Sequence, residues 1–303
     1  MTGKGNGFSI IDPRTLSKPL SKLIDAIRSG VGVLYEPRRI RRRAEAEAKI
    51  VLFKADLECR DLAERAARRL GFQELRRQQN IDAIVEGAAE ALPQTVSAEP
   101  VDPDWVSRFF QECQDVSNEQ LQQLWSHLLA KEVGQPGSCS RRTLSVLQSM
   151  SPADAATFRR ACSLVWVMDH DGALLFTGRV DETGRTTASV ELAYDILQKD
   201  YALSYDDLIN LDSLGLLHLA SDTAQQWEPG DRLSYAGIEH VVLEKRRRSR
   251  PIHCLALTRS GLELYHVSST PMNEEYYRAM LYTLLGEYDL RVGCPLNGGA
   301  RCR

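Results

Sequence analysis

The segment from Arg38 to Leu92 contains no proline and consists largely of alanine, glutamate, arginine and leucine. These residues form helices readily, and over this length they predict one or two long helices, with Gly71 as the expected break. The apolar positions recur too irregularly for a coiled coil. We therefore expect a mostly α-helical protein with a long N-terminal helical arm and a smaller α+β part further along the chain.

Another amphipathic helix is predicted just before this arm, ending at Pro37. Its apolar residues are spaced as one face of a helix, and they are Leu20, Leu23, Ile24, Ile27, Val31 and Leu34. Basic residues lie off this face, so the helix could bind an anionic membrane or the groove of a partner protein. A helix docked on the protein's own core carries the same stripe, and both interpretations stay open.

Two clusters of basic residues are candidate sites for binding a partner or phosphate. The first lies where the two helical segments meet and contains Arg38, Arg39, Arg41, Arg42 and Arg43. Positive charge at a helix start opposes the helix dipole, which is a small argument for a bound partner, and a solvated helix start stays equally open. The second lies at a predicted hairpin, where a solvated end protected from edge pairing competes with a phosphate contact, and it contains Lys245, Arg246, Arg247, Arg248 and Arg250.

The sequence VDPDW predicts the start of a further helix. Asp102 can cap free backbone N–H groups, Pro103 suits the first helical position, and Asp104 adds favourable charge in the first turn. The two aspartates are thus explained by folding, without a catalytic role.

Aromatic residues on this helix and the next predict a packed core. Trp105 and Phe109 lie four residues apart on one helix face, and Trp125 belongs to the following helix. That next helix is predicted to begin with a capping box from Ser117 to Gln120.

Beyond these helices, the pattern changes to helix, turn, helix and strand, followed by strands at SYAGIEHVVLEK and PIHCLALT and a last helix. Helices followed by a two-stranded wing resemble a winged-helix arrangement. A DNA-reading helix needs basic and amide side chains, whereas the helix predicted from Tyr205 to Leu214 carries three aspartates and no lysine or arginine.

These patterns divide the chain into four expected parts. Residues 1–92 form the amphipathic helix and the helical arm, residues 93–167 a compact helical domain, residues 168–290 a winged-helix-like α+β domain, and residues 291–303 a disordered tail.

Charge is distributed unevenly along the chain, although the formal net charge is only −3. Residues 1–43 hold ten Lys/Arg and three Asp/Glu, a difference of plus seven, whereas residues 82–135 hold two and ten, a difference of minus eight. A protein that coats nucleic acid over its whole surface would be basic overall, so the negative net charge argues against that class of protein.

No familiar chemical motif is present. The seven cysteines are scattered singly, which favours buried thiols in a reducing cytoplasm. Asp169, His170 and Asp171 are more typical of a hairpin loop than of a metal site. We therefore expect no catalytic residues, no metal and no cofactor, although scattered carboxylates leave a cryptic nuclease or hydrolase open. The sequence shows no signal peptide or membrane span, which indicates a cytoplasmic protein with peripheral membrane contact still open.

Several segments carry a family resemblance: LYEPRRIRRRAEAEAKI, RRQQNIDAIVEGAAEALP, the stretch from PVDPDW to SPADAATF, and LINLDSLGLLH. Together they resemble a bacterial and prophage family of unknown function, whose central region is similar to that of the Abi-alpha abortive-infection proteins. The resemblance runs from about Leu34 to Val267, implies a tie to phage defence, and supplies no catalytic residues.

The function expected is that of a non-enzymatic sensor or adaptor acting through protein or membrane contacts of its basic helical arm. The alternative is a nucleic-acid-binding regulator that uses the clustered arginines. The partners expected are a second copy of the chain, a protein effector or an anionic membrane surface, with any binding to nucleic acid weak and non-specific.

Overall fold

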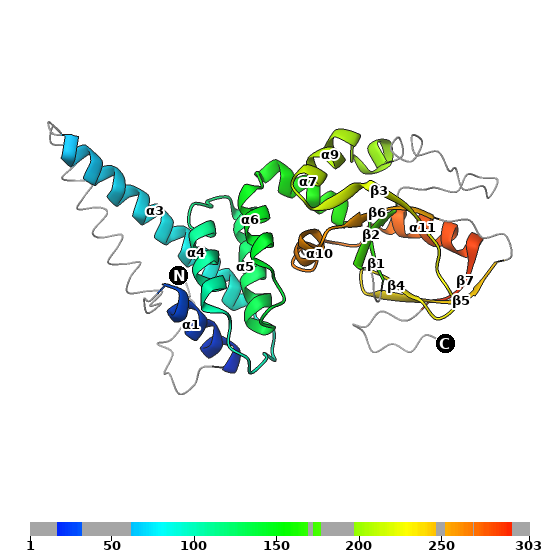
Figure 1. Ribbon diagram of the computed structural model, residues 1–303, viewed down its shortest axis with the longest axis horizontal. Coiled ribbons are helices and arrows are strands. Elements are labelled where there is room, and N and C mark those ends of the chain that lie inside the picture. Colours follow the sequence, from blue (N-terminus) through cyan, green and yellow to red (C-terminus); the bar gives the residue numbers. More distant parts are fainter. Residues whose placement is uncertain are drawn as a thin grey trace, which may run out of the picture. The chain divides into compact units, whose positions relative to one another are not determined.

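The computed structural model describes residues 17–31, 62–168, 172–176, 197–246, 252–268 and 270–292. The protein is mostly α-helical with a smaller α+β part, as predicted (Figure 1). The chain divides into two compact units, Met1–Leu144 and Ser145–Arg303. This division differs from the four parts expected, because the helices of residues 18–31 and 62–90 pack onto the helices that follow them.

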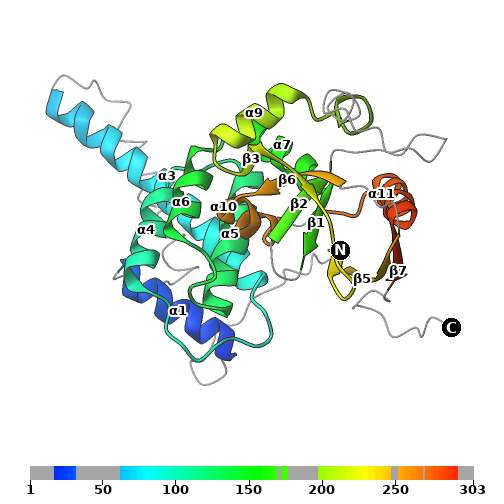
Figure 2. The ribbon, with the colours of Figure 1, turned by 45° about the vertical axis from the view of Figure 1, so that its right-hand side comes forward.

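The first unit is a helical bundle. It contains α1 (Lys18–Val31), α3 (Leu62–Glu90), α4 (Pro103–Cys113) and α5 (Glu119–Gly134), and α6 (Arg141–Ser149) spans the boundary between the units. Helix α1 packs mainly on α4 and also on α5, while α3 packs mainly on α5 (Figure 2).

The core of this bundle is aromatic, as expected from the sequence. Trp105, Phe109 and Trp125 are buried, with exposed fractions of 3%, 0% and 0%. The ring of Phe109 stacks on Trp105 at a centroid distance of 5.3 Å and meets Trp125 edge-on at 5.2 Å. Both geometries are favourable for aromatic pairs.

Capping residues set where these helices begin. The Asp102 side chain accepts a hydrogen bond from the backbone N–H of Asp104, and Pro103 occupies the first turn of α4. The cap of α5 was predicted one residue too early: Asn118, not Ser117, accepts the N–H groups of Gln120 and Leu121. Both residue types are good caps, so the sequence alone does not distinguish adjacent candidates.

The apolar stripe of α1 faces the bundle. Leu23 and Ile27 are 1% and 4% exposed, because α1 lies against α4. They are therefore not an accessible membrane or partner face, and the alternative of a helix docked on its own core holds for them. Leu20 and Ile24 are half-buried, Val31 ends the helix, and Leu34 lies outside the described residues.

Helix α3 runs unbroken through Gly71, where a break was predicted. A glycine inside a helix costs only about 1 kcal/mol relative to alanine. The strong helix formers on either side outweigh that cost.

The described residues of the second unit form helices and a sheet. Its helices are α7 (Pro152–Cys162), a short one at 197–201, α9 (Tyr205–Ser213), α10 (Arg259–Tyr265) and α11 (Glu274–Glu287). Its strands are β1 (Val165–Met168), β2 (Gly172–Phe176), β3 (Leu217–Gln225), β4 (Arg232–Tyr235), β5 (Ile238–Lys245), β6 (Ile252–Leu257) and β7 (Tyr288–Val292). The predicted strands correspond to β3, the β4–β5 hairpin and β6.

The sheet is larger than the two-stranded wing expected. Its seven strands lie in the order β3-β6-β2-β1-β4-β5-β7, and every neighbouring pair is antiparallel. The expected hairpin between β5 and β6 is not formed, because β5 pairs with β4 and β7 whereas β6 pairs with β2 and β3. The described strands therefore do not form the two-stranded wing that was predicted after helix α9. The loop from Asp169 to Asp171 joins β1 to β2 and lies outside the described residues.

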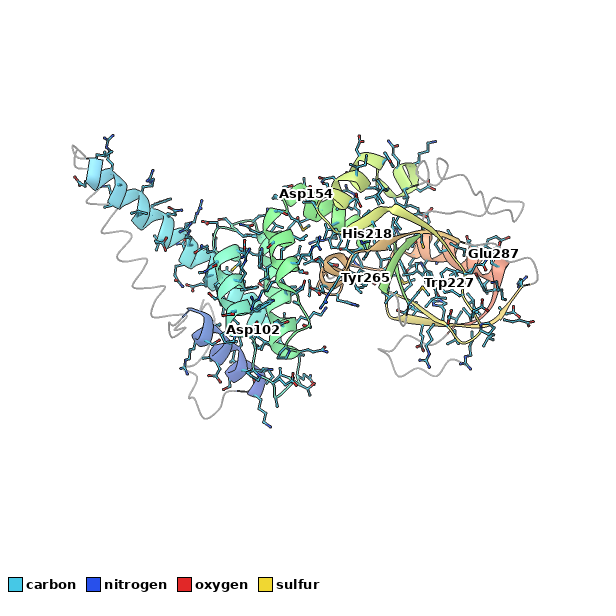
Figure 3. The ribbon with its side chains drawn as sticks, in the orientation of Figure 1. Asp102, Asp154, His218, Trp227, Tyr265 and Glu287 are labelled. Atoms are coloured by element: carbon cyan, nitrogen blue, oxygen red, sulfur yellow. The ribbon has the colours of Figure 1, made fainter. Side chains whose placement is uncertain are left out.

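The core of the second unit is also aromatic. The Trp166 ring lies 5.2 Å from Tyr235 and 5.1 Å from His240. The buried Trp227, labelled in Figure 3, lies edge-on to Tyr288 of β7 at a centroid distance of 5.5 Å. Helix α11 covers β5, since the hydroxyl of Tyr277 lies 3.0 Å from Nε2 of His240.

Candidate interaction surface on helix α3

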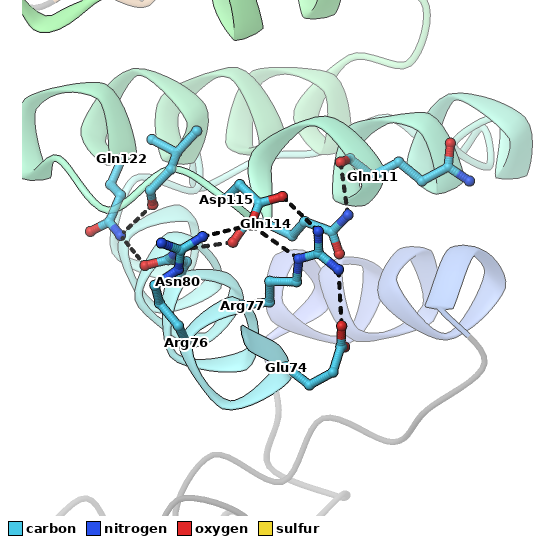
Figure 4. Close-up of polar contacts among 9 residues, drawn as sticks. Glu74, Arg76, Arg77, Asn80, Gln111, Gln114, Asp115 and Gln122 are labelled. Carbon is cyan, nitrogen blue, oxygen red and sulfur yellow. Dashed lines mark hydrogen bonds and ion pairs between the residues drawn. The ribbon is translucent and has the colours of Figure 1, made fainter. Parts of the chain in front are cut away.

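Helix α3 is fastened to the bundle by a polar cluster at its middle (Figure 4). Arg77 donates to both carboxylate oxygens of Asp115, from Nε at 3.0 Å and from Nη2 at 2.9 Å, and Arg76 donates to the same carboxylate at 3.0 Å. Asn80 donates to the backbone carbonyl of Gln114 at 2.8 Å. We call Arg76, Arg77, Asn80, Gln114 and Asp115 the clamp.

The charged groups of the clamp stabilise each other's ionised forms. The hydrogen bond from Arg77 holds the pKa of the Asp115 carboxyl below its usual range, and Arg76 adds to this effect. The same contacts raise the pKa of Arg77, with Glu74 contributing. Both groups therefore stay charged at neutral pH, and the two parallel contacts fix their relative orientation.

The two halves of α3 on either side of the clamp differ in burial. In the C-terminal half, Ile84, Val85 and Ala88 are buried, and the hydroxyl of Ser126 on α5 donates to the Ile84 carbonyl at 2.9 Å. In the N-terminal half, the large apolar side chains of Leu62, Leu70 and Phe72 are exposed, at 72%, 55% and 64%.

A line of exposed residues follows one face of the N-terminal half. Its members are separated alternately by three and four residues, and they are Leu62, Arg65, Arg69, Phe72 and Arg76. We call this line the α3 stripe. No ion pair joins Arg65 or Arg69 to any other residue that the structure describes. The stripe thus presents two apolar side chains and two arginines that are not paired within the described part of the chain.

The sequence contained a signal for this stripe that was missed. Residues at alternating steps of three and four mark the contact face of packed helices. Such a face is usually apolar, whereas three of the five positions here are arginine, so the pattern was not recognised. Only the structure shows that this face is left uncovered by the described part of the bundle.

The residues predicted as basic binding sites are placed only in part. Arg38, Arg39, Arg41, Arg42 and Arg43 lie outside the described residues, as do Arg247, Arg248 and Arg250. The two described members of the second cluster have partners within the chain: the Lys245 amine donates to the Gln226 side chain at 2.7 Å, and Arg246 lies 3.6 Å from Asp289.

The described residues offer no evident catalytic centre. They contain no cluster of three or more metal-binding side chains. Burial raises the pKa of the Cys113 thiol and raises that of Cys162 to about 12, so neither forms a thiolate at neutral pH. The buried Glu132, whose pKa burial also raises, accepts backbone N–H groups of Gly137 and Cys139 at 2.7 and 2.9 Å and holds a turn.

None of the described helices is long and apolar enough to cross a membrane.

A family model for proteins of unknown function, DUF2806, matches residues 64–281. The chain belongs to the DUF2806 family. The DUF2806 match begins within the exposed half of α3 and ends within α11. No curated protein and no solved structure matches the chain.

Proposed function

We propose that this DUF2806 protein is a non-enzymatic adaptor that binds a partner protein through the α3 stripe. The observation that carries the proposal is the contrast along α3: one half is anchored in the bundle by the clamp and Ser126, while the other exposes Leu62, Phe72 and two arginines. Large exposed apolar side chains in a group are typical of a binding surface.

The chemistry of the stripe favours an acidic amphipathic helix as the docking element. Steps of three and four residues let two helices pack side by side. Leu62 and Phe72 would be the apolar anchors, and Arg65 and Arg69 would face carboxylates of the partner, with attraction that weakens as salt increases. Insertion into a membrane is less favoured, because it needs a continuous apolar face.

A nucleic-acid-binding regulator is the second candidate, because Arg65, Arg69 and Arg76 form a line on one helix face. Arginines so placed can contact phosphates without reading sequence. Helix α9 does not add base readout, since Asp206 and Asp207 occupy its first turn and Asp207 belongs to its capping box.

A bacterial or prophage origin and a role in phage defence belong to the same proposal. They rest on the resemblance of several segments to the family similar to the Abi-alpha abortive-infection proteins. In that setting, the adaptor would link detection of infection to an effector protein.

Binding assays with three probes separate the candidates. The purified chain is tested against a mixed-sequence DNA duplex, against vesicles containing anionic lipid, and against proteins cross-linked to it in its host cells. The adaptor predicts a discrete protein partner lost in the double variant Arg65→Glu, Arg69→Glu, and kept in the control Glu86→Lys on the other half of α3. Tight DNA or vesicle binding abolished by the same double variant would replace the adaptor with a regulator or a membrane-bound protein.

A further inference from the structure

Strand β7 forms one end of the sheet in the second unit. It pairs with β5 on one side, and no described strand pairs with its other side. An open strand edge presents unpaired backbone N–H and C=O groups that can accept another strand. Its side chains Asp289, Arg291 and Val292 are exposed.

The five residues of β7 read YDLRV, and this order is complementary to itself. When two copies lie antiparallel about Leu290, Asp289 of each faces Arg291 of the other, and Tyr288 faces Val292. Opposite charges are favourable across antiparallel strands, whereas Tyr288 is buried against Trp227 in its own unit, so the two charge pairs carry the complementarity. The two copies of Leu290 face each other at the centre.

We propose that a second copy of this chain pairs with β7 across a two-fold axis at Leu290, joining the two sheets into one. Such an interface is closed, because both copies use the same strand edge and a third copy cannot pair with β7 once the two are joined. A one-residue slip would place Asp289 opposite Leu290 and break both charge pairs, so the charges also select the register.

The ion pair that Asp289 makes within its own chain does not prevent it from pairing with Arg291 of a second copy. Arg246 lies 3.6 Å from it, and the two side chains are 56% and 63% exposed. An exposed pair of this kind contributes little, so Asp289 can bind Arg291 of the second copy. The interface is short, and we expect association to be weak and dependent on protein concentration.

This self-association is independent of partner binding through the α3 stripe, because it uses a different unit of the protein. Phe72→Ala should therefore leave it unchanged and serves as the control.

Sedimentation equilibrium of the full chain over a range of concentrations and salt tests the proposal. Arg291→Glu places carboxylates opposite each other at two symmetric positions and should weaken the dimer about tenfold or more. The double variant Asp289→Arg, Arg291→Glu restores both pairs with exchanged charges and should recover the dimer to within about threefold. Circular dichroism melting confirms that each variant remains folded.

The proposal is overturned by a full chain that stays monomeric at every concentration, by a dimer that Arg291→Glu leaves intact, or by a double variant that fails to recover. A dimer that only Phe72→Ala dissolves would also overturn it and would place self-association on α3.

Discussion

Arg77 of α3 holds Asp115 through two parallel nitrogen–oxygen contacts of 3.0 and 2.9 Å, although 38 residues separate them along the chain. The pair lies where α3 passes the connection between α4 and α5 (Figure 4). It therefore marks the boundary between the half of α3 that is part of the core and the half that is exposed.

Asp115→Ala should loosen the clamp without unfolding the bundle. Removing a bidentate partner of two partly exposed arginines should lower the free energy of unfolding by about 1 kcal/mol. Hydrogen exchange should speed up in residues 62–79 more than in residues 80–90. Glu74→Ala is the control, because Glu74 contacts Arg77 from the same helix. Equal exchange in both halves of α3 would show that the clamp does not anchor the helix.

Two glycines of α3 should respond in opposite directions to alanine. A Cβ at Gly71 would meet no atom within 4 Å, whereas one at Gly87 would lie 2.6 Å from Oγ of Ser126. Gly71→Ala should stabilise the protein by about 0.5–1 kcal/mol, and Gly87→Ala should destabilise it by about 1–3 kcal/mol through overpacking. Urea unfolding followed by circular dichroism measures both; destabilisation by Gly71→Ala would contradict an exposed, continuous helix.

Local chemistry made the helix starts and the aromatic core predictable. Asp102 and Ser151 cap α4 and α7 as their sequences indicate, and Trp105 and Phe109 are buried because they share one helix face. The docking of α1 was not decided by its sequence, since an amphipathic stripe fits a membrane, a partner or a neighbouring helix equally well.

Contacts between residues far apart in the sequence could not be predicted either, because local patterns do not specify which elements meet. The Arg77–Asp115 pair depends on where α3 crosses the α4–α5 connection, and neither residue carries a local signal for the other. The position of β7 at a sheet edge likewise depends on its pairing with β5, as in Val242 opposite Leu290. The candidate site was thus recognised only after the fold was known.

The first turn of α4 provides a test of its structural role. Trp105→Ala should lower the free energy of unfolding by about 3–5 kcal/mol as a truncation of a buried aromatic residue. Asp102→Asn should have little effect, because asparagine also caps helices and the lost ion pair with Arg141 is exposed. Thermal melting measures both. A biological activity abolished by Asp102→Asn at an unchanged melting temperature would point to a chemical role.

Stability of the second unit should fall on mild acidification because of His240. Burial lowers the pKa of His240 from its usual 6.5, so the unfolded state binds the proton more tightly than the folded state. The stability that depends on neutral His240 is fully present above pH 6.5. It is lost as the pH falls toward and through the lower pKa of His240 in the folded protein. Three carboxyl groups with lowered pKa values reduce stability only when the pH falls below 3.8, and they belong to Asp102, Asp115 and Asp154.

Urea unfolding at about pH 5 and at about pH 7.5 isolates the histidine. His240→Gln should reduce the difference in stability between the two pH values, although the variant is less stable because its contact with Tyr277 changes. An unchanged difference in His240→Gln would assign the acid sensitivity to other groups.

Site-specific photo-cross-linking in the host tests whether the exposed half of α3 binds a partner protein. A photoreactive amino acid is placed at Phe72 on the α3 stripe and, as the matched control, at Glu86, which is exposed on the same helix beyond the clamp. We expect a discrete cross-linked protein from position 72 that is absent from position 86 and is lost when Arg65→Glu and Arg69→Glu are added. The same products from both positions, or none from position 72 in the folded chain, would contradict it.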